Sequence, residues 1–325
     1  MFKKILVPLD GSLRAERALP VAARIARASE GSVLLLQVVS PPVDYGSGFS
    51  PVPFVTGELI KEEMKEADSY LNVVATSSVL AGIETSTDVI YGLAAQQLLT
   101  IAEEQSVDLI VLCSHGRTGL TRWVLGSVAH KLTHESTVPV VVLREKGGEL
   151  ASSQPDSRGR LTRAFVSLDG SELAEAVLRP ATNLVLALSA PKPAVLHLMQ
   201  VVKIFPSTEE QGALSELNQQ AVEEANAYLA TVKARLQQEF PEALLTITWS
   251  VTVENDIAGA LIRTAEAQGE ATASTEPVDC NVMAMSTHGR GGLQRWMIGS
   301  ITERVLAATH LPMLIVRPKK PRSMK

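Results

Sequence analysis

One string of fourteen residues occurs twice in this chain, and this duplication limits the folds open to it. SHGRTGLTRWVLGS covers residues 114–127 and THGRGGLQRWMIGS covers residues 287–300, with nine identical positions and no gap. Each copy lies near the end of a longer segment of similar sequence. The other matching segments are KILVPLDGS (4–12) with AFVSLDGS (164–171), VLLLQVV (33–39) with VLHLMQVV (195–202), and VPVVVLR (138–144) with LPMLIVR (311–317). Because the order is the same in both halves, the sequence predicts a duplicated domain.

The two repeats divide the chain into domains of ordinary size. A chain of 325 residues is long enough for two separate cores. We predict a first domain at 1–146, a linker at 147–160 and a second domain at 161–320. The segment EKGGELASSQPDSRGR around the linker is polar and rich in Gly, Ser and Arg, as flexible connections are.

Within each repeat, short apolar runs alternate with segments of helical periodicity. KILVPL, DLIVLC and VPVVVL are continuously apolar, which is typical of parallel strands covered on both faces. In SLRAERALPVAARIARASE, Leu13, Ala22 and Ile25 can share one helix face, as can Leu98 and Ile101 in a later segment. The sequence therefore predicts an α/β fold of two tandem doubly wound parallel-sheet domains.

The composition excludes several classes of partner. The net charge of −5 and the aromatic content of 4% argue against a nucleic-acid partner, because such surfaces are usually basic and offer stacking rings. Cys113 and Cys280 lie in apolar runs and form no disulfide framework. No apolar run approaches the ~20 residues that cross a bilayer. We expect a cytoplasmic protein with no membrane partner.

The duplicated string follows an apolar strand and ends where a helix is expected to begin, near Ser127. A Gly–Ser pair at a helix start offers unsatisfied N–H groups, a positive dipole end and a hydroxyl, which together suit a phosphate. Gly116 and Gly289 let the loop backbone approach an anion, and Arg117 and Arg290 add a cation. The alternative is a tight turn in which the serine caps the helix and nothing binds. Two copies of the whole string favour the anion site.

Histidines in and near the string have simpler explanations than catalysis or metal binding. His115 and His288 could assist phosphoryl chemistry, but no partner acid or base is evident, and a role in shaping the loop is favoured. His130 and His134 lie four apart on a predicted helix without a third ligand, so no metal site is predicted.

The spacing of the string resembles the nucleotide-binding branch of the universal stress protein family, in a tandem form that covers nearly the whole chain. That branch has Gly, two residues, Gly, nine residues, then Gly–Ser or Gly–Thr. The second Gly and the final pair are present in both halves, as Gly116, Gly126 and Ser127, and as Gly289, Gly299 and Ser300. The first Gly is replaced by Cys113 and Ser286, which add atoms where the family's backbone lies against the ribose.

The resemblance also implies a fold and the other end of a site. It implies an adenine nucleotide alpha hydrolase-like fold with strand order 3-2-1-4-5, whose ligand crevice lies at the carboxyl ends of strands one and four. Asp10 and Asp169 would contact the adenine and ribose side, and Val38 and Val201 would lie beside the adenine. An Asx turn or an N-cap for the helix near Leu13 is the alternative role of Asp10.

The function implied by the resemblance is binding of ATP (or AMP), with Mg²⁺ bridging the phosphates, by a sensor or regulator in stress response. Slow ATP hydrolysis or phosphotransfer is one alternative, and a scaffold with vestigial sites is another; no positioned nucleophile and base can be identified, so an enzyme is less favoured. The apolar fifth strands are implied to pair across a pseudo-twofold axis. This pairing could lie within one chain or join two chains as a homodimer.

Overall fold

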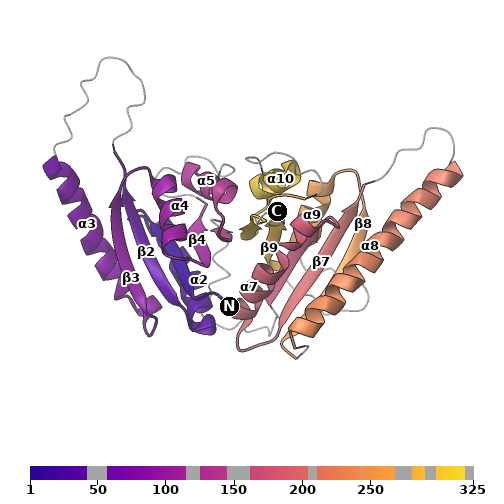
Figure 1. Cartoon of the computed structure of the whole chain (residues 1–325), viewed down its shortest axis with the longest axis horizontal. Coiled ribbons are helices and arrows are strands. Elements are labelled where there is room, and N and C mark those ends of the chain that lie inside the picture. Colours follow the sequence, from indigo (N-terminus) through magenta and orange to yellow (C-terminus); the bar gives the residue numbers. More distant parts are fainter. Residues whose placement is uncertain are drawn as a thin grey trace, which may run out of the picture.

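The computed structural model describes residues 1–41, 57–114, 125–144, 162–203, 211–241, 243–267, 280–289 and 298–318. Ten strands form one continuous sheet, with helices packed on both of its faces (Figure 1). The predicted linker at 147–160 lies outside the described residues, and the domain boundaries stay a prediction. No described helix combines the length and the apolar character needed to cross a membrane.

The two halves contain matching elements in the same order. The first half consists of β1 (Lys4–Leu9), α1 (Leu13–Glu16), α2 (Ala18–Ser29), β2 (Ser32–Val39), α3 (Gly57–Ala75), the 3₁₀ helix η1 (Ser78–Leu80), β3 (Thr85–Tyr91), α4 (Ala94–Glu104), β4 (Leu109–Cys113), α5 (Ser127–Glu135) and β5 (Val140–Leu143). The second half consists of β6 (Thr162–Leu168), α6 (Glu172–Glu175), α7 (Leu178–Ser189), β7 (Ala194–Val202), α8 (Gln211–Glu239), β8 (Leu245–Val253), α9 (Ile257–Glu266), β9 (Cys280–Ser286), α10 (Ser300–Ala308) and β10 (Met313–Val316).

The strand order is β3-β2-β1-β4-β5-β10-β9-β6-β7-β8. Each half therefore has the expected order 3-2-1-4-5, and its strands are all parallel. At the centre, β5 and β10 pair antiparallel, with Leu314 opposite Val141. The fifth strands thus pair within the chain, and the two predicted sheets are one sheet.

Beside the central strands β5 and β10, two arginines form hydrogen bonds between the halves. Arg144 follows β5, and its guanidinium donates a hydrogen bond to the carbonyl of Leu306 near the end of α10. Arg317 follows β10 and donates to the carbonyls of His134 and Glu135 at the end of α5, at 3.3 and 3.0 Å. Each half therefore supplies a cation to the carboxyl end of the other half's last helix, where the helix dipole favours positive charge.

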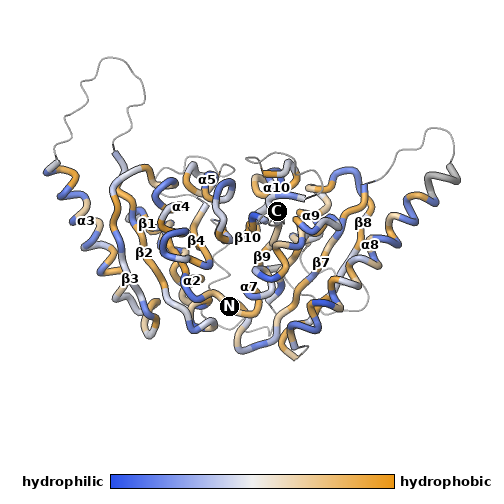
Figure 2. The backbone as a smooth tube through the Cα atoms, in the orientation of Figure 1, coloured by the Kyte–Doolittle hydropathy of each residue, from blue (hydrophilic) through white to orange (hydrophobic). Residues whose placement is uncertain are grey.

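The core follows from the apolar strands, whose alternate residues point to opposite faces. On one face a continuous cluster joins the strands to α2, α3, α7 and α8 across both halves. On the other face, α4 and α5 cover the first half, and α9 and α10 cover the second. Figure 2 shows the strands mainly in hydrophobic colours, while α3 alternates between hydrophobic and hydrophilic residues. Leu98 and Ile101 are buried, as predicted.

One predicted core residue is wrong. Leu13 is 82% exposed and does not share a face with Ala22 and Ile25. The expected single helix is interrupted at Arg17, where α1 ends and α2 begins. Ser12 caps the start of the short α1 by accepting a hydrogen bond from the amide of Ala15. The periodicity that begins at Leu13 therefore does not continue into α2.

Candidate functional site

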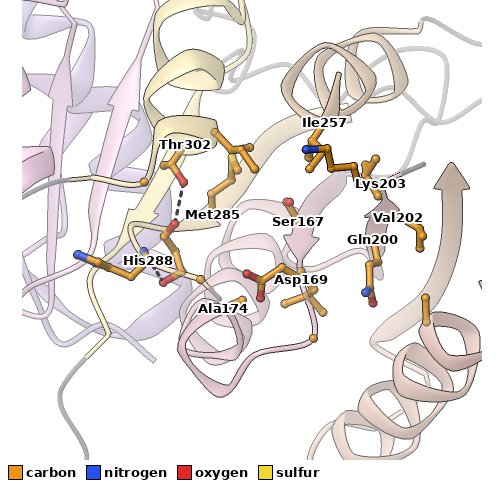
Figure 3. A pocket seen from close by; sticks show the side chains of 18 of the residues that line it. Ser167, Asp169, Ala174, Gln200, Val202, Lys203, Ile257, Met285, His288 and Thr302 are labelled. Carbon is orange, nitrogen blue, oxygen red and sulfur yellow. Dashed lines mark hydrogen bonds between the residues drawn. The ribbon is translucent and has the colours of Figure 1, made fainter. Parts of the chain in front are cut away.

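A cavity of about 810 Å³ opens at the carboxyl ends of β6, β7 and β9 in the second half (Figure 3). The starts of α9 and α10 line it on one side of the sheet, and α8 lines it on the other. Its volume is typical of small-molecule sites. The corresponding cavity of the first half is about 200 Å³. Both lie where the predicted crevice was expected, beside the first and fourth strands of each half.

Asp169 and Gly289 meet at the floor of the larger cavity. A Cβ atom added to Gly289 would lie only 1.9 Å from Oδ2 of Asp169, so a side chain at this position cannot coexist with the carboxylate as placed. The other oxygen, Oδ1, accepts hydrogen bonds from the amide and the hydroxyl of Ser171, at 3.0 and 2.6 Å. The fold therefore brings the aspartate of LDGS against the glycine of the duplicated string and holds the carboxylate in one orientation.

The same local turn occurs in both halves. Oδ1 of Asp10 accepts a hydrogen bond from the amide of Ser12 at 3.0 Å, as Asp169 does from Ser171. The N-caps of α1 and α6 are the serines, whose hydroxyls accept from the amides three residues later at 3.2 Å. The aspartates thus take the Asx-turn role but not the N-cap role.

The helices after the duplicated string begin at Ser127 and Ser300, as predicted, but the serines do not cap them. The N-cap positions are Gly126 and Gly299, without a side-chain cap. Capping of these helices by Ser127 and Ser300 is therefore wrong, and binding of an anion at the helix starts stays a prediction. The glycine amides are not bare, since Gly126 donates to the carbonyl of Ser114 and Gly299 to that of Thr287, both at 2.8 Å.

The amides available to an anion are those that follow these glycines. In α10, the first intrahelical bond is donated by Glu303 to the carbonyl of Gly299. The amides of residues 300–302 precede it and have no intrahelical acceptor. Ser300 is exposed, and all three residues line the larger cavity. This end of the cavity therefore presents N–H groups and the positive end of a helix dipole.

The remaining predicted site residues divide between the two cavities. Val201, Ser286 and His288 line the larger one; Val38 and Cys113 line the smaller one, with Asp10, Gly126 and Ser127. His115, Gly116, Arg117 and Arg290 lie outside the described residues.

The ring of His288 forms a hydrogen bond within its own loop. Its Nδ1 lies 2.8 Å from the hydroxyl of Thr287. Figure 3 shows the ring directed away from Asp169 and Gln200. This contact fits the loop-shaping role rather than proton transfer to a ligand in the cavity.

Cys113 is a neutral thiol at the wall of the first cavity. Burial, with a smaller contribution from the Asp10 carboxylate, raises the pKa of its thiol to about 12 against the opposing effect of Arg17. A thiolate is the reactive form of cysteine. Cys113 is therefore a small apolar wall residue rather than a nucleophile.

Sequence reasoning missed the side of the larger cavity that faces α8. Gln200 and Lys203 come from the end of β7, and Glu224 and Tyr228 come from α8. Burial raises the pKa of the Tyr228 hydroxyl, and the neighbouring carboxylate of Glu175 raises it further. No motif marks these residues. A glutamine inside the apolar run VLHLMQVV was the available signal.

Comparisons with known proteins show the family and support the fold. The profile described as the universal stress protein family matches twice, at residues 1–144 and 162–317. Universal stress protein YxiE of Bacillus subtilis is 32% identical over 148 residues, which are 44% of this chain and 100% of that protein. A universal stress protein of Mycolicibacterium smegmatis is 26% identical over 97% of both chains. The crystal structure of a universal stress protein from Archaeoglobus fulgidus has a TM-score of 0.62 at 18% identity, covers 98% of this chain and 97% of its own, and supports the fold.

Proposed function

The chain belongs to the universal stress protein family, and on that premise we propose that it binds an adenine nucleotide, ATP or AMP, at the crevice of each domain. The role we infer is that of a cytoplasmic, nucleotide-dependent sensor or regulator in stress response. The observation that carries the proposal is the meeting of Asp169, Gly289 and the first turn of α10 at one cavity of about 810 Å³.

The chemistry of the cavity suits the parts of a nucleotide. Phosphates would lie at the amides and the hydroxyl that open α10 at Ser300, because a helix start favours anions. The carboxylate of Asp169 would accept hydrogen bonds from ribose hydroxyls, and Val201 offers an apolar surface to a base. Lys203 adds a positive charge to the cavity wall.

A magnesium ion would be held mainly by the phosphates. Among the described residues, no group of three His, Cys, Asp or Glu side chains could hold a metal ion by itself. Mg²⁺ is commonly bound through substrate phosphates with few protein ligands. Such an ion would neutralise phosphate charge that Lys203 alone would leave uncompensated.

The two domains are expected to bind with different strength. The first cavity, at about 200 Å³, is smaller than the volume of roughly 300–1,000 Å³ that is usual for ligand sites. Leu98 and Cys113 occupy its wall. We therefore assign the stronger site to the second domain.

The enzymatic alternative gains no specific support from the described part of the chain. His288 is engaged with Thr287, and its ring is directed away from Asp169 (Figure 3). The thiol of Cys113 stays protonated near neutral pH, because burial raises its pKa to about 12. Binding, rather than turnover, is the function that the geometry supports best.

Calorimetric titration of the full chain with ATP and Mg²⁺ tests the proposal. We expect saturable binding that is strongly reduced when Gly126→Val and Gly299→Val are combined, because both glycines line the cavities where the helices begin. Mass spectrometry of gently purified protein should detect a co-purifying adenine nucleotide. Absence of binding by the wild type, or undiminished binding by the double variant, would contradict the proposal and favour vestigial sites.

A further inference from the structure

Gln200 carries a buried polar group that finds no partner among the described residues. The residue is only 7% exposed, and its Oε1 accepts no hydrogen bond from the part of the chain that the structure describes. Buried acceptors without a donor are rare in folded proteins because they forfeit the hydrogen bond that water provided. Gln200 lines the larger cavity, so a bound molecule can provide the missing donor.

The position of Gln200 places it at the base end of the proposed nucleotide site. In the sheet, Gln200 is registered opposite Leu168, the residue before Asp169, and it directly precedes Val201. Figure 3 shows Gln200 and Asp169 at neighbouring strand ends, with Thr302 of α10 on the far side of Asp169. A nucleotide with its phosphates at α10 and its ribose at Asp169 would extend its base toward Gln200.

We propose that Gln200 selects adenine over bases that carry a carbonyl at position 6, an inference that rests on the proposed nucleotide binding. A glutamine amide matches the N6/N7 edge of adenine, since its oxygen accepts from the exocyclic amine while its nitrogen donates to N7. Hypoxanthine and guanine present acceptors at both O6 and N7, so only one of the two hydrogen bonds can form in either orientation of the amide. Gln200 is thus a specificity-determining residue of the second domain.

The first domain provides a matched control. Gln37 is registered opposite Leu9 as Gln200 is opposite Leu168, and its Oε1 is also buried without a partner. Gln37 does not line the first cavity, however. Replacing either glutamine by leucine removes a buried unpartnered acceptor, so neither change should lower the thermal stability of the unliganded protein.

The test compares ATP with inosine triphosphate, which differs by a carbonyl in place of the amine. Titrations use the full chain in a Gly126→Val background, so that the second site dominates. We expect the parent to prefer ATP by roughly tenfold, and Gln200→Leu to lose this preference through weaker ATP binding with little change for inosine triphosphate. Gln37→Leu should keep the parental preference, and Gln200→Met should repeat the result if the leucine variant is unstable.

The outcomes separate this inference from the function on which it rests. If Gln200→Leu keeps the preference for ATP, or loses both nucleotides equally, adenine selection by Gln200 is refuted while nucleotide binding stands. If the wild type binds neither nucleotide, both proposals fail.

Discussion

Replacing Gly289 by alanine adds one methyl group at the point where the duplicated string meets Asp169. The new Cβ would lie 1.9 Å from Oδ2 and 2.9 Å from Cγ of that residue. Carbon atoms normally approach non-bonded neighbours no closer than about 3.5 Å, so the carboxylate or the loop must move by more than about 1 Å. Such a movement breaks the hydrogen bonds that orient Asp169 from Ser171.

The consequence for binding can be estimated from the bonds that are lost. A hydrogen bond to a charged group contributes about 1.5–3 kcal/mol, and each 1.4 kcal/mol changes an equilibrium constant about tenfold. If Asp169 holds the ribose, Gly289→Ala should raise the Kd for ATP at the second site by roughly 10- to 100-fold. Calorimetric titration of the wild type and the variant, with urea unfolding of both, measures this change against any change in stability.

Gly259→Ala is the matched control. Its added Cβ would lie 2.2 Å from Oδ2 of Asp256, so it forces a similar displacement of an aspartate. Neither Gly259 nor Asp256 lines the cavity. The reasoning is refuted if Gly289→Ala binds ATP as the wild type does, or if the control loses as much affinity.

Two further predictions concern stability. Burial, with the nearby Arg163, lowers the pKa of His197 to about 4. A depressed pKa in the folded state gives stability that is present above the unfolded pKa of about 6.5 and is lost as the pH falls toward 4. Urea unfolding at pH 7, 5 and 4 should therefore show a steeper loss of stability for the wild type than for His197→Leu. An equal loss in both proteins would exclude His197 as the cause. Arg317→Ala should lower the free energy of unfolding by about 1–2 kcal/mol, because the carbonyls at the end of α5 lose a cationic donor. Arg304→Ala, which removes an exposed ion pair with Asp256, should lower the free energy of unfolding less than Arg317→Ala does, and a larger cost would contradict this ranking.

The repeats and the apolar strands predicted two tandem α/β domains correctly, while the strand order of each half came from the family resemblance. These features are determined by burial along whole segments, which a sequence displays directly. Leu13 was misplaced because the helix is interrupted at Arg17, so Leu13 lies on the short α1 and not on α2. The pairing of β5 with β10 could not be chosen from sequence, since identical strands would meet in the same way between two chains.

The candidate site was predicted in part. The helix starts follow from the Gly–Ser pairs, and the aspartates follow from the family resemblance. Their meeting agrees with the rule that ligands lie at the carboxyl ends of parallel strands. The glycine amides were misassigned, because the loop carbonyls of Ser114 and Thr287 use them. The α8 side was missed, since Tyr228 and Glu224 lie on a long helix whose facing direction depends on packing rather than on a motif.

The antiparallel pairing of β5 and β10, together with Arg144 and Arg317, which each bind a helix of the other half, has a consequence for how such a protein can evolve. A symmetric assembly of two identical subunits must keep its two clefts the same, because every substitution appears twice. Here each copy of the repeat is encoded separately, so the cavity of one half can be enlarged, with Gln200 in its wall, while the cavity of the other half contracts. Because both cavities lie in one chain, every molecule carries one of each, and this one-to-one ratio does not change on dilution.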